Sequence, residues 1–107
     1  MGRKRRLSFT AFSVLYAITN GHPYGFDIME ATGLASGTVY PVLSRLERDG
    51  LVRSSWEDEA RAAAEGRPAR RYYEASRDGA AALREAVMML RGIAGDRLIV
   101  PQASATS

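Results

Sequence analysis

The spacing of hydrophobic residues in the first half of the chain is helical, and it predicts three helices. The first covers residues 7–19 and has Ser8 as a suitable N-cap. The second covers residues 24–31, after which Gly33 suits the left-handed conformation that ends many helices. The third covers residues 36–49. Three helices in close succession indicate a small helical domain.

The pattern changes after the third helix, where two short segments are rich in aromatic and β-branched residues. Residues 51–57 and 69–75 therefore predict the two strands of a hairpin. The segment 58–68 between them is polar and alanine-rich and closes with Gly-Arg-Pro, which we interpret as a long hairpin loop. Ser76 is then a suitable N-cap for a fourth helix that extends to about Gly95.

The predicted order of three helices, a hairpin and a final helix is typical of a winged helix-turn-helix protein. The predicted fold class is therefore mainly α with a small β-hairpin. We divide the chain into a flexible basic arm (1–6), a winged helix-turn-helix domain (7–75), a C-terminal helix (76–100) and a disordered tail (101–107).

The first predicted helix is apolar on most of its circumference. No charged residue occurs between Leu7 and Phe26, and the large side chains do not form a single stripe. A helix that is apolar all round has to be buried on most sides. A second copy of the chain is an economical cover, so Phe9 and Phe12 are expected at a contact between two copies. The alternative is the central core helix of a monomer.

The third predicted helix has two different faces when its residues are placed at about 100° intervals. The core stripe is formed by Val39, Val42, Leu43 and Leu46. The opposite face begins with small side chains, which let a helix backbone approach the floor of the DNA major groove. A phenol and two guanidiniums follow. The residues of this opposite face are Gly37, Tyr40, Pro41, Ser44, Arg45 and Arg48.

These residue types are able to recognise DNA. Ser36, Thr38 and the free amides of the first turn can hold a phosphate. Tyr40 can donate a hydrogen bond or pack against a thymine methyl group. Arg45 and Arg48 are long enough to reach phosphates or the O6/N7 edge of guanine. The alternative is a solvated helix face with incidental arginines.

Pro41 is unfavourable inside a helix, because it lacks an N–H group and its ring crowds the preceding turn. A helix that began at Ser36 would place this proline in its interior. We therefore expect a late or distorted first turn, with the first true helical residue near Thr38 or Val39.

A second cluster of basic residues lies in the hairpin, where Arg67, Arg70 and Arg71 are close in sequence. Arginines at a hairpin tip can follow a phosphate backbone or enter a narrow minor groove. Adjacent strand residues point to opposite faces, so only one of Arg70 and Arg71 is expected to face DNA. The other is expected to pair with Glu57 or Glu74.

The last predicted helix carries an apolar stripe whose spacing alternates between four and three residues, as in the seam of a short coiled coil. Its positions are Leu83, Val87, Leu90 and Ala94. This stripe predicts that the segment 76–100 is a dimerisation helix. The alternative is an amphipathic helix that folds onto its own domain.

Composition limits the classes of function. The chain has 107 residues, of which 46% are hydrophobic and 25% charged, as expected of one globular domain. It has no cysteine and one histidine, which excludes disulfides, thiol catalysis and cysteine-rich zinc sites. No phosphate-binding glycine loop is present, and we expect neither an enzyme nor a metal or cofactor site. No apolar stretch is long enough to span a membrane, so the expected location is the cytoplasm.

The net charge of +3 comes from 15 basic and 12 acidic residues, but four of the basic residues lie in the arm 1–6. Without the arm the balance is 11 basic against 12 acidic residues. A polyanion-binding surface must therefore come from local clustering of charge and not from the total. The arm itself is either a phosphate contact or a solubilising terminus.

The strings GTVYPVLSRLE (37–47) and RRYY (70–73), within a segment from about residue 9 to residue 90, resemble the PadR family of bacterial transcriptional regulators. The resemblance implies a winged helix-turn-helix homodimer that usually represses transcription by binding double-stranded DNA at a palindromic operator. The positions that it assigns to the major groove are Ser36, Gly37, Thr38, Tyr40 and Pro41, and those that it assigns to the minor groove or the backbone are Arg67, Arg70 and Arg71.

Only one C-terminal helix fits the chain, which resembles the short subgroup of this family. The larger C-terminal domain through which some longer relatives respond to phenolic acids is absent, so we do not expect that ligand. For an effector of unknown identity, a pocket between the first and last helices of two copies has Trp56, Met88 and Met89 as candidate lining residues, although simple packing is the preferred interpretation.

A winged helix can also serve as a protein-interaction module that does not bind DNA. Such modules often lack a basic recognition face. The two arginine clusters of this chain, on the third helix and in the hairpin, favour DNA binding over this alternative.

Overall fold

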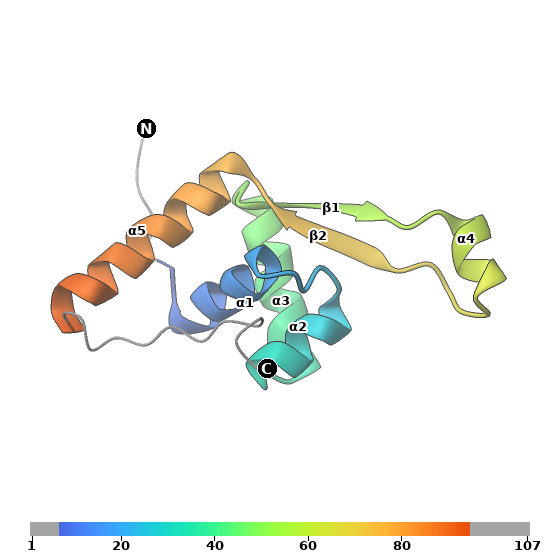
Figure 1. Cartoon of the computed structure of the whole chain (residues 1–107), viewed down its shortest axis with the longest axis horizontal. Helices are drawn as coiled ribbons and strands as arrows, with labels where there is room; N and C mark the ends of the chain where they lie inside the picture. Colours follow the sequence, from blue (N-terminus) through green and yellow to red (C-terminus); the bar gives the residue numbers. More distant parts are fainter. Residues whose placement is uncertain (1–6, 95–107) are drawn as a thin grey trace.

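The computed structural model describes residues 7–94 (Figure 1). The predicted arm (1–6), the predicted tail (101–107) and the end of the predicted last helix lie outside the described residues. The fold is mainly α with a two-stranded antiparallel sheet, as predicted. Its elements are α1 (Phe9–Thr19), α2 (Gly25–Thr32), α3 (Ser36–Arg48), β1 (Val52–Trp56), α4 (Glu59–Ala64), β2 (Arg71–Ala75) and α5 (Arg77–Ala94).

Helices α1, α2 and α3 pack around a common hydrophobic core. Leu15 of α1 and Ile28 of α2 are fully buried in it, and the four apolar positions predicted for the core stripe of α3 are buried as well. Ser8 is the N-cap of α1, as predicted, and its hydroxyl accepts a hydrogen bond from the amide of Ala11 at 3.1 Å. The hydrophobic spacing of these segments therefore identifies their buried faces correctly.

The turn between α2 and α3 depends on Gly33. This residue has a φ angle of +77°, in the left-handed region that favours glycine, and its amide donates to the carbonyl of Met29 at 2.8 Å. The chain leaves α2 sharply at this point and begins α3 after three residues. The result is the tight pair of helices expected of a helix-turn-helix.

Helix α3 is regular from its first residue, and the expectation of a late or distorted first turn is wrong. The amides of Thr38 and Val39 both donate to the carbonyl of Ala35 at 2.9 Å. The hydrogen bond that Pro41 cannot donate would end four residues earlier, at Gly37. Both residues are exposed, so the missing bond lies on the solvent side of the helix, where water can reach the carbonyl.

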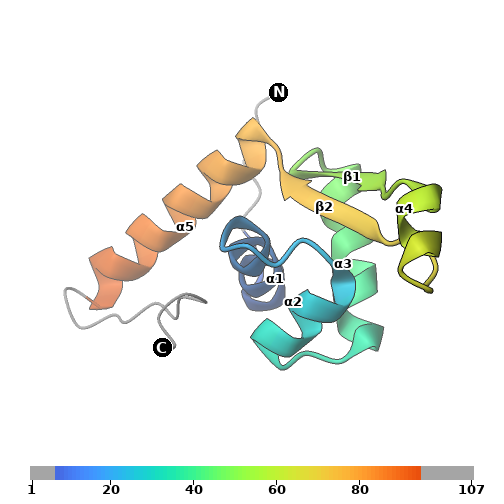
Figure 2. The same ribbon diagram turned by 45° about the vertical axis from the view of Figure 1, so that its right-hand side comes forward.

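The wing, defined as residues 52–75, extends from the C-terminal end of α3 to one side of the molecule (Figures 1 and 2). Strands β1 and β2 pair antiparallel in a register that places Val52 opposite Ala75. Tyr24, immediately before α2, forms a β-bridge with Tyr72 on the other edge of β2. The wing is therefore tied to the beginning of α2 as well as to the end of α3.

The wing tip, defined as residues 57–70, contains the short helix α4 where the sequence pattern predicts a loop. Asp58 is its N-cap and accepts a hydrogen bond from the amide of Ala60 at 3.2 Å, and Ala62 is buried. The sequence of α4 contains only strong helix formers, yet six residues are too few to form a stable helix alone. The prediction of a plain loop is wrong because contacts within the tip supply the missing stability.

Helix α5 begins against the base of the wing. Ser76 caps it as predicted, since its hydroxyl accepts from the amide of Gly79 at 3.0 Å and also donates to the carbonyl of Gly50 at 2.6 Å. Gly79 lies so close to Leu51 that a Cβ atom would come within 2.9 Å of the Leu51 carbonyl carbon. The other end of α5 extends to the opposite side of the core from the wing tip (Figure 1).

Helix α1 is covered mainly by its own chain, because it contacts α2, α3, β2 and α5. Phe12 is half-buried and stacks on Tyr16, with a distance of 5.9 Å between the ring centroids. Phe9 remains 79% exposed. Within one chain, α1 is therefore a central core helix, as the alternative to a contact between two copies predicts, and it has an exposed phenylalanine at its beginning. None of the described helices has the length and apolar character needed to cross a membrane.

Candidate nucleic-acid interface

The side of α3 that faces away from the core is open to solvent along the whole helix. We call it the α3 face. All of its residues are exposed except Thr38, which is half-buried. The residues of the α3 face are Ser36, Gly37, Thr38, Tyr40, Pro41, Ser44, Arg45 and Arg48.

The beginning of the α3 face offers backbone amides. The N-cap residue is Ala35, whose side chain cannot accept a hydrogen bond, so no side chain caps the first turn. The amides of Ser36 and Gly37 lie at the positive end of the helix dipole, where an anion is favoured. Because both residues have small side chains, a phosphate can approach this turn closely.

The end of the α3 face offers two cations. Arg45 and Arg48 are exposed in the last turn of the helix. In the described part of the chain neither guanidinium has an ion-pair partner. They are three residues apart and therefore lie on the same side of α3. Both are free to contact an anion outside the protein.

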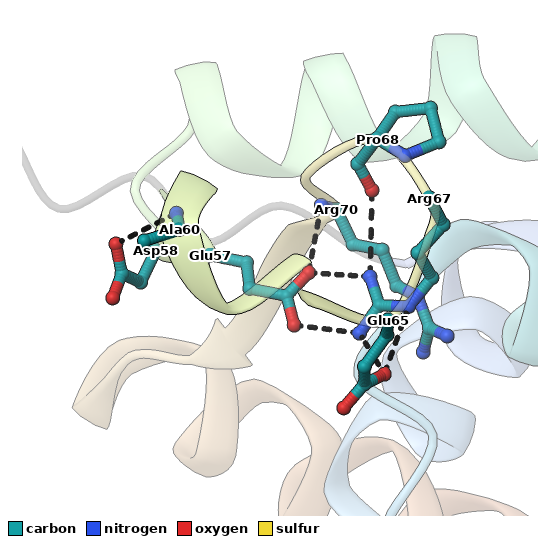
Figure 3. A network of polar contacts seen from close by, with 7 residues as sticks. All are labelled: Glu57, Asp58, Ala60, Glu65, Arg67, Pro68 and Arg70. Carbon is teal, nitrogen blue, oxygen red and sulfur yellow. Dashed lines mark hydrogen bonds and ion pairs between the residues drawn. The ribbon is translucent and has the colours of Figure 1, made fainter. Parts of the chain in front are cut away.

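Arg67, which is predicted to reach DNA, is held inside the wing tip instead (Figure 3). Its two terminal nitrogens donate to the two carboxylate oxygens of Glu57 at 2.6 and 2.8 Å, and a further bond reaches Glu65 at 3.0 Å. The side chain of Glu57 is only 3% exposed. A bidentate pair with a buried carboxylate leaves this guanidinium occupied, so Arg67 shapes the wing tip.

Glu57 is the centre of this arrangement. Its carboxylate also accepts from the backbone amide of Arg70 at 3.1 Å, so it connects the two strands where they leave the sheet. The hydrogen bonds from Arg67, followed by the one from Arg70, lower the pKa of Glu57 from 4.5 to about 2, although burial opposes the shift. The carboxylate is therefore charged at neutral pH and holds the wing tip closed.

Arg71 connects the wing to α3. Its guanidinium donates to the hydroxyl of Ser54 at 2.8 Å and lies 3.4 Å from the carboxylate of Glu47. Ser54 in turn donates to the same carboxylate at 2.7 Å. The guanidinium also lies 5.6 Å from the ring centroid of Trp56. Its partner is thus Glu47 of α3. The expected ion pair with Glu57 or Glu74 is wrong, because in the described chain Glu57 pairs with Arg67 and Glu74 with Arg53.

Among Arg67, Arg70 and Arg71, Arg70 is the one whose guanidinium has no ion pair in the described chain. Its guanidinium lies 4.4 Å from the ring centroid of Tyr24, and within the described residues it has no acidic partner. Tyr24 packs against Tyr72 with the two rings tilted by 35° and their centroids 4.8 Å apart, and this contact supports the ring under the cation. The structure therefore separates the two neighbours, with Arg71 turned to α3 and Arg70 exposed beside the start of α2.

The residues expected at a contact between two copies lie in different environments. Leu83 is 9% exposed and belongs to the core of its own chain, because the first half of α5 packs on α1 and β2. Val87 is half-buried, and Leu90 is exposed. Ala94 is the last residue of α5, and its side chain lies outside the described part. Leu83 therefore lies in the core of its own chain, and not on the surface where a contact with a second copy is predicted.

A different apolar surface on α5 is open. Met89, Leu90 and Ile93 are exposed, with Ile93 at 79%, and they lie within about 100° of one another around the helix. We call these three residues the α5 arc. It shares Leu90 with the predicted stripe but is otherwise offset from it, because the stripe begins on the side that α5 turns toward its own core.

The candidate lining residues of an effector pocket do not converge within one chain. Trp56 is the last residue of β1, at the start of the wing tip, whereas Met88 and Met89 lie in the second half of α5. These two regions are on opposite sides of the core (Figure 1). All three side chains are exposed and form no common cavity in the described chain.

Three contributors to this surface have no signal in the sequence pattern. Tyr24 supports Arg70, Glu47 holds Arg71, and Gly25 lies directly against the ring of Tyr40. Each acts through a contact between elements that are distant in the sequence. Together with the α3 face, Arg70 forms a surface that combines amides, a phenol and cations. Such a surface can bind a polyanion and contact base edges.

Comparison with known proteins identifies relatives of the chain. The model of the transcriptional regulator PadR-like family matches residues 14–85, more than half of the sequence. A PadR family transcription regulator from Clostridium difficile R20291 is 22% identical, with a TM-score of 0.72 over 81% of this chain and 92% of that one. No curated protein sequence matches the chain.

Two other solved structures are similar and carry information about ligands. The transcriptional regulator MosR of M. tuberculosis, in complex with DNA, is 29% identical, with a TM-score of 0.66 over 84% of this chain and 60% of that one. BpsR of Bordetella bronchiseptica, whose DNA binding is regulated by 6-hydroxynicotinic acid, is 25% identical, with a TM-score of 0.68 over 88% of this chain and 69% of that one.

Proposed function

Since this chain belongs to the PadR-like family of transcriptional regulators, we propose that it binds double-stranded DNA in a sequence-specific manner. In this function the beginning of α3 enters the major groove, and Arg70 contacts the phosphate backbone beside it. The wing tip follows the backbone or the adjacent minor groove.

The observation that carries the proposal is the character of the α3 face. A solvated helix side with incidental arginines would be expected to pair its cations with nearby acids, yet Arg45 and Arg48 have no such partner in the described chain. The same face begins with uncapped amides and small side chains. Close approach at one end and free cations at the other are the properties that a groove-binding helix needs.

The second part of the proposal is a homodimer in which the α5 arc of one chain packs against a second copy. Met89, Leu90 and Ile93 are large apolar residues that remain 47%, 38% and 79% exposed in the described chain. Phe9 at the beginning of α1 adds an exposed aromatic ring. Apolar side chains grouped in this way are favoured at interfaces between copies.

The third part concerns the target and the outcome. A dimer with two-fold symmetry presents two α3 faces and therefore reads an inverted repeat, with half-sites about one helical turn apart. Such a complex represses transcription when its site overlaps a promoter, which is the usual role in the family that the sequence resembles. A small-molecule effector would have to bind between two copies, because the candidate lining residues Trp56, Met88 and Met89 do not meet in one chain.

The experiment that tests DNA binding is a salt titration. Affinity for a random-sequence duplex is measured by fluorescence anisotropy from low to physiological salt. We expect a steep linear fall of log K with log salt concentration, because each neutralised phosphate releases condensed counterions. Binding that is absent even at low salt would instead favour the protein-interaction module, for which salt-independent association with a protein is the expected behaviour.

A further inference from the structure

Tyr40 of the α3 face lies against the first residue of α2. A Cβ atom placed on Gly25 would come within 2.6 Å of the Tyr40 Cζ atom and 2.7 Å of Cε1, with the phenol oxygen closer still. Real Cβ atoms do not approach other heavy atoms this closely. The space beside Gly25 is therefore occupied by the far end of the Tyr40 ring, and a side chain at this position would displace the ring.

The backbone of α2 does not require a glycine at this position. The glycines of the described chain with a positive φ angle are Gly21, Gly33, Gly50 and Gly66, and Gly25 is not among them. It is a buried helical residue, and glycine is a poorer helix former than alanine. Steric room for Tyr40 is thus the property that glycine provides here.

The contact restricts the side chain of Tyr40 from one side. The residue is 47% exposed, so one side of the phenol rests on α2 while the rest remains open to solvent. A side chain that is already held in one orientation loses less conformational entropy on binding, and it presents its hydroxyl at a fixed position. A freely rotating phenol on the same helix would satisfy neither condition.

From this contact we infer that Gly25 is a positioning residue for DNA recognition. Gly25 leaves the space in which the Tyr40 ring rests, and this fixes the direction in which the phenol meets a base pair in the major groove. The inference rests on the proposed function, in which Tyr40 makes a base-directed contact. It assigns a role in sequence discrimination to a residue that does not itself face DNA.

The test is a double-mutant cycle with G25A, Y40A and the variant that carries both substitutions. Each is measured on the duplex enriched from a random library by the unmodified chain and on a random-sequence duplex of the same length. The readout is the ratio of the two affinities. G92A is the matched control, because Gly92 is an exposed helical glycine with nothing within 4 Å of an added Cβ and it lies outside the α5 arc.

We expect Y40A and G25A each to lower the affinity ratio roughly fivefold or more, as the loss of one base contact does. The double variant should be no worse than Y40A alone, because both substitutions remove the same contact. The affinity of each variant for the random duplex should stay within about twofold of that of the unmodified chain. G92A should also leave the affinity ratio within about twofold of its unmodified value. A steric account also predicts that G25A, if it fails to fold, regains its fold when Y40A is added.

The possible failures are distinguishable. If Y40A leaves the ratio unchanged, the base-directed role of Tyr40 in the proposed function is incorrect. If Y40A lowers the ratio but a folded G25A does not, the positioning role of Gly25 is overturned. Additive losses in the double variant, or a double variant that stays unfolded, would overturn it as well.

Discussion

Glu57 and Arg67 form a bidentate ion pair across the wing tip, with the Nη1 and Nη2 atoms of the arginine 2.6 and 2.8 Å from the two carboxylate oxygens. The two residues are ten positions apart in the sequence, and α4 lies between them. The pair therefore closes the loop that carries α4, and Asp58 caps the helix from inside this loop. The shape of the wing tip depends on a charged glutamate.

This dependence gives a prediction for pH. The pKa of Glu57 is lowered from 4.5 to about 2 in the folded chain, so its stabilising contribution is complete above about pH 4.5 and is lost as the pH falls toward 2. Amide hydrogen exchange of α4, corrected for intrinsic rates, should show protection that declines across this range. E57Q should exchange faster at pH 7 and lose most of the pH dependence.

The control for this measurement is the exposed pair of Arg53 and Glu74, whose side chains are 69% and 71% exposed. Surface pairs contribute little, so E74Q should leave the protection of α4 unchanged. Equal exchange rates in E57Q and the unmodified chain at pH 7 would contradict the proposed role of the pair.

The exposed position of Arg70 gives a second prediction. R70A should reduce the slope of log K against log salt concentration by about one for each protomer that binds, because one phosphate contact is lost. The loss of affinity should be similar on all duplexes. R53A removes the same charge from β1, where Glu74 already pairs with the arginine, and should leave the slope nearly unchanged. The idea fails if the two variants have the same slope.

The junction between the wing and α5 gives a third prediction. G79A would place a methyl group against the backbone of Leu51, which cannot move away as a side chain could. Overpacking of this kind costs about 1–3 kcal/mol, equivalent to a fall in Tm of roughly 4–8 °C for each kcal/mol in a domain of this size. Thermal unfolding followed by circular dichroism measures this fall in Tm. A G79A variant as stable as G92A would show that the junction is not tightly packed.

The two surfaces of α5 give a fourth prediction. I93D should convert a dimer to a folded monomer, because Ile93 is exposed within one chain and belongs to the α5 arc. L83D should unfold the protein, because it places a charge in the core. Light scattering gives the mass and circular dichroism gives the fold. A dimer mass that I93D does not change would place the contact between copies elsewhere.

The helices, the hairpin and the buried face of α3 follow from the sequence because they depend on local patterns. Ser8, Gly33 and Ser76 mark helix ends through hydrogen bonds with residues three or four positions away, and such signals can be read without a structure. Helix α4 had such a signal in Asp58 and the alanine-rich segment after it. The segment is too short for its periodicity to distinguish a helix from a loop.

The partners of the arginines could not be predicted in the same way. Arg67 and Arg71 carry the same charge as Arg70, and the sequence does not show which guanidinium meets an acid once the chain has folded. Arg71 reaches Glu47 because β1 packs on α3 and β2 pairs with β1, and Leu83 enters the core because α5 packs on α1. These are properties of the packing of elements, which residue spacing within one element does not contain.

The most direct test of the central claim is selection of bound duplexes from a random library, with the stoichiometry of the selected complex measured by analytical ultracentrifugation. If a symmetric pair of α3 faces reads the DNA, the selection should enrich an inverted repeat with half-sites about one helical turn apart. Two chains should then bind each duplex. A library that shows no enrichment at low salt, or an asymmetric site occupied by a single chain, would contradict it.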